Sequence, residues 1–142
     1  MSTLKKIALA IVAIHFVVVV LHSIAHQLLW VNASPAQLAF IVPAIIVAPV
    51  VAGIMLPKFE KFGTVLLAAS MFGSFVFGLY YHFIADTIDH VAHVAQLEPH
   101  GWSQMFVATS YLLAISELLG AVVGLLLLLR PSTTAARGNH AF

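Results

Sequence analysis

The chain has 142 residues, of which 62% are hydrophobic and only 8% charged, and its formal net charge is +1. This composition lies far outside that of water-soluble domains and predicts an integral membrane protein. A near-neutral chain has no basic field for nucleic acid, so we expect no nucleic-acid partner. Cysteine is absent, which excludes disulfides, thiolate metal sites and iron–sulfur clusters. Polar chemistry must therefore come from eight histidines, five carboxylates and scattered hydroxyls.

Four apolar segments follow one another along the chain, and each is long enough to cross about 30 Å of hydrocarbon as a helix. They cover about residues 4–30, 37–56, 62–85 and 102–129, and the third is open to extension as far as about residue 97. The predicted fold class is an all-α membrane protein, a four-helix transmembrane bundle that forms one domain over residues 1–142. We expect residues 131–142 to be a disordered tail.

The basic residues predict the orientation of the bundle. All of them fall on one side of the four predicted spans: Lys5, Lys6, Lys58, Lys61, Arg130 and Arg137. By the positive-inside rule both termini are cytoplasmic, and the loops after Trp30 and Phe83 lie outside. The predicted location is a prokaryotic cytoplasmic membrane, with the lipid bilayer as the first partner.

The second span carries two prolines and no ionisable residue, so we expect kinks and a packing role. The prolines are Pro43 and Pro49, and each removes a helix hydrogen bond. Small residues recur at helical spacing on the last two spans, and this spacing predicts close helix contact. Gly120 and Gly124 are the glycines of span four, and such a face also permits a homo-oligomer.

Three histidines of the first span share one helix face. His15, His22 and His26 are spaced i, i+7 and i+11, which places them within about 40° of one another. Ionisable groups are costly in lipid, so this stripe should face the bundle interior and find partners there.

The third span and the segment after it repeat this spacing. His82, Asp86, Asp89 and His93 lie at i, i+4, i+7 and i+11, so they share a face if the helix continues past the membrane surface. His90 lies about 80° from His82 and joins them if the helix end is bent. The alternative is that the histidines beyond the span belong to a polar, solvated loop.

Depth in the membrane gives a separate comparison, at about 1.5 Å per residue from the nearest basic residue of each span. His26 and His82 come out level, at about 30 Å and about 32 Å. Glu117, the one carboxylate within a hydrophobic stretch, lies about 20 Å deep, between His15 at about 14 Å and His22 at about 24 Å. We therefore expect one interior column of polar groups that is densest toward the outer face.

Imidazole and carboxylate groups without thiolates are ligands for iron, copper and zinc. His22 and His26 form an H-x-x-x-H pair on one helix, and the glutamate of the zinc-protease motif is missing because Ser23 follows His22. His90 and His93 form an H-x-x-H pair. The candidate metal ligands are His22, His26, His82, Asp86, Asp89, His90 and His93.

These two histidine pairs resemble the histidine boxes of membrane desaturases and hydroxylases, which hold two irons between transmembrane helices. The resemblance covers His22, His26, His90 and His93. Those families also carry an H-x-x-H-H box, more histidines and a longer chain, so the resemblance does not establish membership.

Three functions remain open from the residues alone. The first is a membrane metalloprotein with a transition-metal site near the outer face. If it is an enzyme, we expect an oxidoreductase in which Glu117, Tyr81 or Tyr111 donates or accepts protons or hydrogen bonds.

The second is a b-type haem electron-transfer bundle, with His22 or His26 opposite His82. The third is a proton or metal-ion pathway, or a small accessory subunit of a larger membrane complex, with His15, Glu117, His22 and His82 as a relay.

Overall fold

The computed structural model describes residues 1–130 and is helical throughout its regular structure. The predicted tail over residues 131–142, with Arg137, lies outside the described residues. Four helices are long and apolar enough to cross a membrane: Thr3–Leu28, Pro35–Met55, Glu60–Ile84 and His100–Leu128. The prediction of an all-helical chain with four candidate spans is confirmed.

Two of the four spans change helix type along their length. The first and fourth are uninterrupted α-helices, α1 (Thr3–Leu28) and α6 (His100–Leu128). The second consists of α2 (Pro35–Phe40), the π-helix η1 (Ile41–Val47) and α3 (Ala48–Met55). The third consists of α4 (Glu60–Leu79) and the π-helix η2 (Tyr80–Ile84), and the short α5 (Val91–Val94) lies in the loop that follows.

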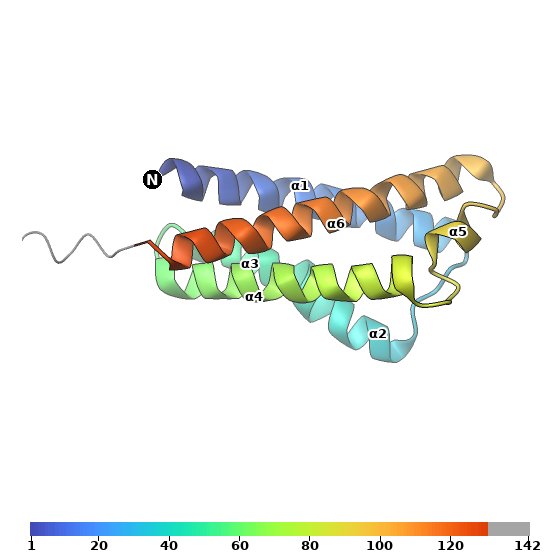
Figure 1. Cartoon of the computed structure of the whole chain (residues 1–142), viewed down its shortest axis with the longest axis horizontal. Helices are drawn as coiled ribbons and strands as arrows, with labels where there is room; N and C mark the ends of the chain where they lie inside the picture. Colours follow the sequence, from blue (N-terminus) through green and yellow to red (C-terminus); the bar gives the residue numbers. More distant parts are fainter. Residues whose placement is uncertain (131–142) are drawn as a thin grey trace, which may run out of the picture.

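The helices form an elongated bundle (Figure 1). Helix α6 packs against α1 and α4, and α3 packs against α4 and α1. Helix α2 swings away from the other helices at the end of the bundle that carries the connecting loops (Figure 1). We call this the loop end, because the segments 29–34 and 85–99 lie there, and the opposite end the basic end.

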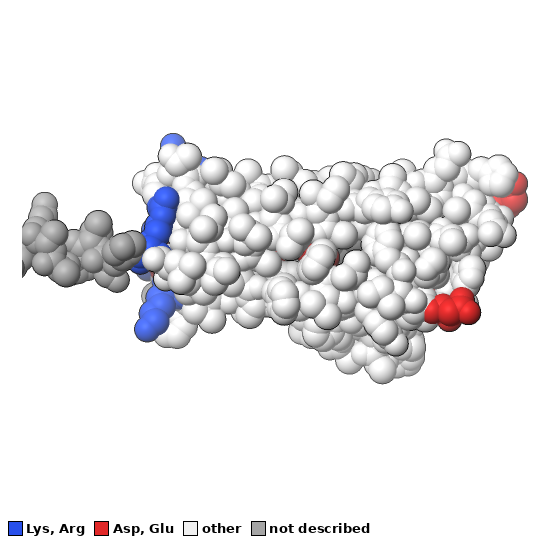
Figure 2. Space-filling view, viewed as in Figure 1, with Lys and Arg blue, Asp and Glu red and all other residues white. Residues whose placement is uncertain are grey.

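Charge is separated along the bundle. Figure 2 shows Lys and Arg at the basic end, acidic side chains at the loop end and, between them, a broad surface with only a small acidic spot. Large apolar side chains are exposed on this surface, among them Ile54, Phe72 and Ile115, consistent with an integral membrane protein. The side of the membrane on which each end lies remains a prediction.

Glycines set the distance between α4 and α6. A Cβ built on Gly124 would stand 2.9 Å from the backbone of Ala68, and one on Gly120 would stand 2.7 Å from the Met71 side chain. The close contact predicted for these two glycines is therefore present. Helix α4 covers this glycine face of α6 inside the bundle. The two glycines therefore do not support an oligomer that forms through this face.

The second span departs from α-helical geometry in the region of its prolines. Pro43 lies within η1, and Pro49 lacks the N–H that would bond to the carbonyl four residues earlier, that of Ile45. His15, which is only 2% exposed, donates its Nε2–H to this Ile45 carbonyl over 3.1 Å. His15 thus satisfies a backbone acceptor that Pro49 leaves free.

The third span ends at Ile84 and does not extend to residue 97. Ala85 adopts an extended conformation with ψ of 137°, and the chain then forms a loop that contains only the short α5. Asp86, Asp89, His90 and His93 therefore do not share one continuous helix face with His82.

Candidate metal centre

Three of the predicted ligands converge near the loop end of the bundle. His22 and His26 come from successive turns of α1, and His82 comes from η2. One ligating nitrogen from each ring lies within 4.8 Å of those of the other two. The closest pair is His22 Nε2 and His26 Nε2, 3.1 Å apart. We call these three residues the histidine triad.

The second ring nitrogen of His26 and of His82 is held by a backbone carbonyl. His26 Nδ1 lies 2.6 Å from the Val31 carbonyl oxygen, and His82 Nδ1 lies 3.1 Å from that of Asp89. A carbonyl can only accept a hydrogen bond, so both Nδ1 atoms carry the hydrogen. In a neutral imidazole the lone pair is then on Nε2.

The tautomer of His22 depends on its contact with α6. His22 Nδ1 lies 2.9 Å from Thr109 Oγ1, and Thr109 Oγ1 also lies 2.7 and 3.0 Å from the carbonyl oxygens of Met105 and Phe106. When the Thr109 hydroxyl donates to one of these carbonyls, it accepts from His22 Nδ1–H, and the Nε2 lone pair of His22 then faces the triad. When it donates to His22 Nδ1, the Nε2–H of His22 donates to His26 Nε2 over 3.1 Å.

The turn that ends α1 brings Val31 to His26. Trp30 adopts a left-handed conformation with φ of 56°. The Val31 N–H bonds to the His26 carbonyl, and the Trp30 N–H bonds to that of Gln27, which is the hydrogen-bond pattern of a Schellman motif. This turn folds Val31 back over His26, so that its carbonyl meets the imidazole.

Phe106 of α6 forms an apolar wall for the triad. Its side chain is fully buried. Its ring centroid lies 4.5 Å from that of His22, 4.7 Å from that of His26 and 5.4 Å from that of His82. On this side the triad faces an aromatic ring rather than water, which restricts access to other directions.

The triad borders a partly open cavity of about 170 Å³ that is also lined by Glu117. Glu117, from the middle of α6, is 3% exposed, and the structure gives it no hydrogen-bond partner among residues 1–130. An added Cβ on Gly78 would lie 3.6 Å from Glu117 Oε2 and 3.9 Å from His82 Cδ2. The carboxyl group and the triad therefore approach the same cavity around Gly78.

Asp89 contributes to the centre in two ways. Its carbonyl holds His82, as described above, and its side chain lines the cavity while only 5% of the residue is exposed. Its Oδ1 atom has no hydrogen-bond partner among the described residues. Burial raises the pKa of the Asp89 carboxyl, because a charge is less favourable away from water.

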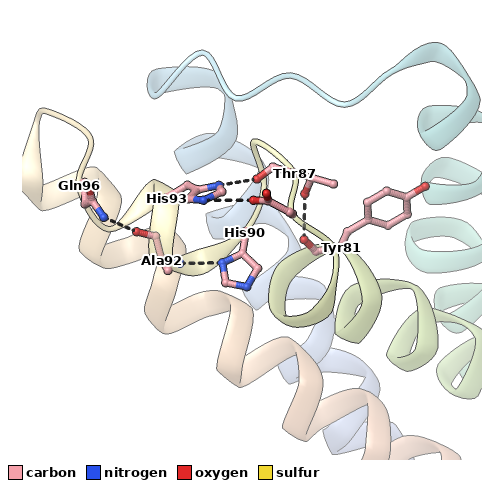
Figure 3. Close-up of polar contacts among 7 residues, drawn as sticks. Tyr81, Thr87, His90, Ala92, His93 and Gln96 are labelled. Atoms are coloured by element: carbon pink, nitrogen blue, oxygen red, sulfur yellow. Dashed lines mark hydrogen bonds and ion pairs between the residues drawn. The ribbon is translucent and has the colours of Figure 1, made fainter.

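The other predicted ligands, Asp86, His90 and His93, lie outside this centre. Asp86 Oδ1 pairs with His93 Nε2 over 3.3 Å on the surface. His93 Nδ1–H donates to the Thr87 carbonyl over 2.9 Å, and His90 Nδ1 accepts from the Ala92 N–H over 3.2 Å (Figure 3). Their groups hold the loop together, and the structure does not bring them to the triad.

Of the three predicted proton-handling residues, only Glu117 lines the cavity. The Tyr81 ring packs on that of Phe77 at 4.6 Å and points away from His90 and His93 (Figure 3). Tyr111 is 52% exposed and packs on Phe83 at 5.0 Å. The structure gives neither tyrosine a place at the centre.

The sequence did not predict the groups that contact the Nδ1 atoms of the triad. Thr109 had a detectable signal: it precedes Arg130 by 21 residues, which puts it about 31 Å deep and level with His26. The carbonyls of Val31 and Asp89 had none, because backbone groups in turns leave no side-chain pattern.

Comparison with known proteins found no match to any family model, curated protein or solved structure. The chemistry is therefore interpreted from the geometry alone. Three imidazoles whose ligating nitrogens lie within 4.8 Å of one another, each with a contact at Nδ1, are a candidate site for a transition-metal ion.

Proposed function

We propose that this chain is a membrane metalloprotein in which His22, His26 and His82 bind one transition-metal ion through Nε2. One observation carries the proposal: a ligating nitrogen from each of the three rings lies within 4.8 Å of those of the other two. The Nδ1 atoms of all three rings contact groups behind the triad, which leaves each Nε2 for one shared ion. Neutral imidazoles are ligands of zinc, copper and iron.

The spacing suits a metal ion. Two nitrogens at about 2.0–2.1 Å from a tetrahedral ion are about 3.4 Å apart. The observed 3.1 Å is close to this value, and the whole triad lies within 4.8 Å. Small ring movements would complete the geometry. Imidazole ligands accommodate zinc, copper and iron alike.

A three-histidine site leaves a coordination position open, as in catalytic metal centres. The cavity, with Glu117 beside it, is placed to receive a bound molecule at that position. A metal bound there would supply Lewis-acid chemistry at the open position, and Glu117 would accept or donate a proton. The Asp89 carboxyl is the candidate for an additional ligand. By the positive-inside rule the site belongs near the outer face of a prokaryotic cytoplasmic membrane.

The haem alternative fits this geometry poorly. The ring centroids of His22 and His82 are 5.0 Å apart, and those of His22 and His26 are 4.7 Å apart. These rings are in contact, so a flat porphyrin cannot pass between them as axial ligation requires. The cavity of about 170 Å³ is close to an engineered cavity of about 150 Å³ that holds one benzene, which is far smaller than a porphyrin.

The ion-pathway alternative lacks a continuous polar route among the described residues. His15 does not line the cavity and is bonded to the Ile45 carbonyl. Toward the basic end the bundle is filled by an apolar cluster that includes Leu56, Leu67 and Met71, all fully buried. This packing favours a closed site over a passage.

Elemental analysis of the purified protein tests the proposal. We expect about one transition-metal ion per chain, lost when His22, His26 or His82 is replaced by alanine. The matched controls are His90→Ala and His93→Ala, which should retain the metal because both side chains bond only within the loop. Equal metal content in triad and control variants would contradict the proposal, and thermal unfolding checks that each variant is folded.

A further inference from the structure

An apolar groove on the side of the bundle meets the metal cavity. The groove runs along α1 and is lined by Val20, Ile24 and Leu28 on that helix and by Ile46 on η1. Val19, Ser23 and Gln27 line both the groove and the cavity. The cavity therefore adjoins a surface that belongs in hydrocarbon.

The course of the second span explains why the groove is open. Near the basic end α1 packs against α3. Toward the loop end, η1 packs against α4 and meets α1 at Ile45, and α2 swings away from the bundle (Figure 1). The groove residues of α1 are left uncovered, with Val20 at 42%, Ile24 at 41% and Leu28 at 46% exposure. A molecule dissolved in the bilayer can reach the cavity this way without crossing the polar loops.

The size of the cavity limits what it holds. Its volume of about 170 Å³ is comparable with that of the engineered cavity of about 150 Å³ that binds benzene. Phe77, Leu113 and Ile41 supply apolar and aromatic walls. One six-membered ring fits, whereas a glycerophospholipid headgroup does not.

The polar groups of the cavity select the chemistry of that ring. Glu117 is 3% exposed, lines the cavity and has no hydrogen-bond partner among residues 1–130. Asp89 is the second carboxyl on the wall, and neither lysine nor arginine lines it. An anionic head such as a fatty-acid carboxylate or a phosphate would find no lysine or arginine here, whereas a neutral hydroxyl gives Glu117 a hydrogen-bond partner.

We propose that the cavity binds the head of a membrane-dissolved phenol or hydroquinone, with its ring between the histidine triad and Glu117 and its alkyl tail in the groove along α1. The ring hydroxyl bonds to the Glu117 carboxyl. This inference rests on the proposed metal site in one respect, since the metal closes one side of the cavity. The groove and Glu117 are independent of the metal.

Binding of decylphenol to the protein in lipid nanodiscs, with empty nanodiscs subtracted, tests the proposal. We expect saturable binding that is weakened about tenfold for decylbenzene, which lacks the hydroxyl, and for the ringless alcohol decanol. Glu117→Leu should weaken decylphenol binding by a similar factor, because it removes the hydrogen-bond partner of the ring hydroxyl.

Two pairs of variants locate the ring and the tail. Gly78→Leu places a side chain in the cavity and should abolish binding. Its control, Gly73→Leu on the same helix, should retain binding, because a Cβ there meets only the Phe40 ring, at 3.7 Å. Ile24→Trp should block the groove, whereas Val17→Trp, exposed on α1 but outside the groove, should not.

Metal content is measured on the same samples, so a failure of the ring-binding proposal can be distinguished from a failure of the metal-site proposal. Protein that holds metal but binds decylphenol no better than decanol, or equally well after Gly78→Leu, overturns the ring site and leaves the metal site standing. Metal-free protein whose decylphenol binding is lost in Gly78→Leu and kept in Gly73→Leu supports the ring site and contradicts the metal site.

Discussion

His22 Nε2 and His26 Nε2 lie 3.1 Å apart near the loop end of the bundle. A divalent ion that binds both nitrogens should therefore stabilise the folded protein. We expect metal at a hundredfold excess over its dissociation constant to raise the free energy of unfolding by about 2.7 kcal/mol. Thermal unfolding with and without added metal measures this, and a chelator should reverse it. An equal shift in His26→Ala would show that the metal acts elsewhere.

Thr109→Val tests the hydrogen bond that orients His22. Valine keeps the shape of threonine but offers no acceptor for His22 Nδ1–H, so metal affinity should fall by about 10–100-fold. Thr109→Ser should restore most of it. The control is Thr64→Val, because Thr64 is also a buried helical threonine whose hydroxyl donates to a backbone carbonyl, that of Glu60. Its metal affinity should equal that of the unaltered protein.

Glu117→Met should stabilise the fold. The Glu117 carboxyl is buried without a hydrogen-bond partner among the described residues, so a methionine of similar length removes a desolvation cost of about 1–3 kcal/mol. Chemical unfolding in detergent measures the gain, and metal content should not change, since Glu117 lies beside the triad and is not part of it. A loss of stability would mean that the carboxyl has a structural partner.

His15→Leu should destabilise the protein and leave its metal intact. The substitution strips the Ile45 carbonyl of its donor, at a cost of about 1–3 kcal/mol. Pro49→Ala restores a backbone N–H four residues after Ile45, so the cost of His15→Leu should shrink in that background. Additive effects of the two changes would contradict the structural role assigned to His15.

Gly124→Ala should separate α4 from α6. Alanine normally favours a helix by up to about 1 kcal/mol over glycine, but its Cβ here would stand 2.9 Å from the Ala68 backbone. We expect a net loss of about 1–3 kcal/mol from overpacking. Gly101→Ala is the control, because a Cβ there meets nothing within 4 Å. Equal stability of the two variants would argue against close helix contact at Gly124.

Much of the fold was predictable because hydrophobicity and helix geometry are regular along the chain. Hydropathy located the four helical spans to within two residues at each end. Depth measured from the basic residues put His26 and His82 at one level, and the structure brings both together with His22. A constant rise per residue suffices for such an alignment.

The loop beyond Ile84 was less predictable. The spacing of Asp86, Asp89 and His93 suits a helix, yet η2 ends before them and the chain turns. Side-chain periodicity does not report where a helix stops when no proline or glycine marks the end. The carbonyl groups that hold His26 and His82 depend on such turns, so no residue pattern encodes them.

X-ray absorption spectroscopy of the metal in the purified protein is the most direct test of the triad. It should show three imidazole nitrogens at about 2.0–2.1 Å if the ion is zinc. Any of the variants His22→Ala, His26→Ala and His82→Ala that retains metal should show one imidazole fewer. A first shell that lacks imidazole, or one that is unchanged in all three variants, would contradict a metal centre built from His22, His26 and His82.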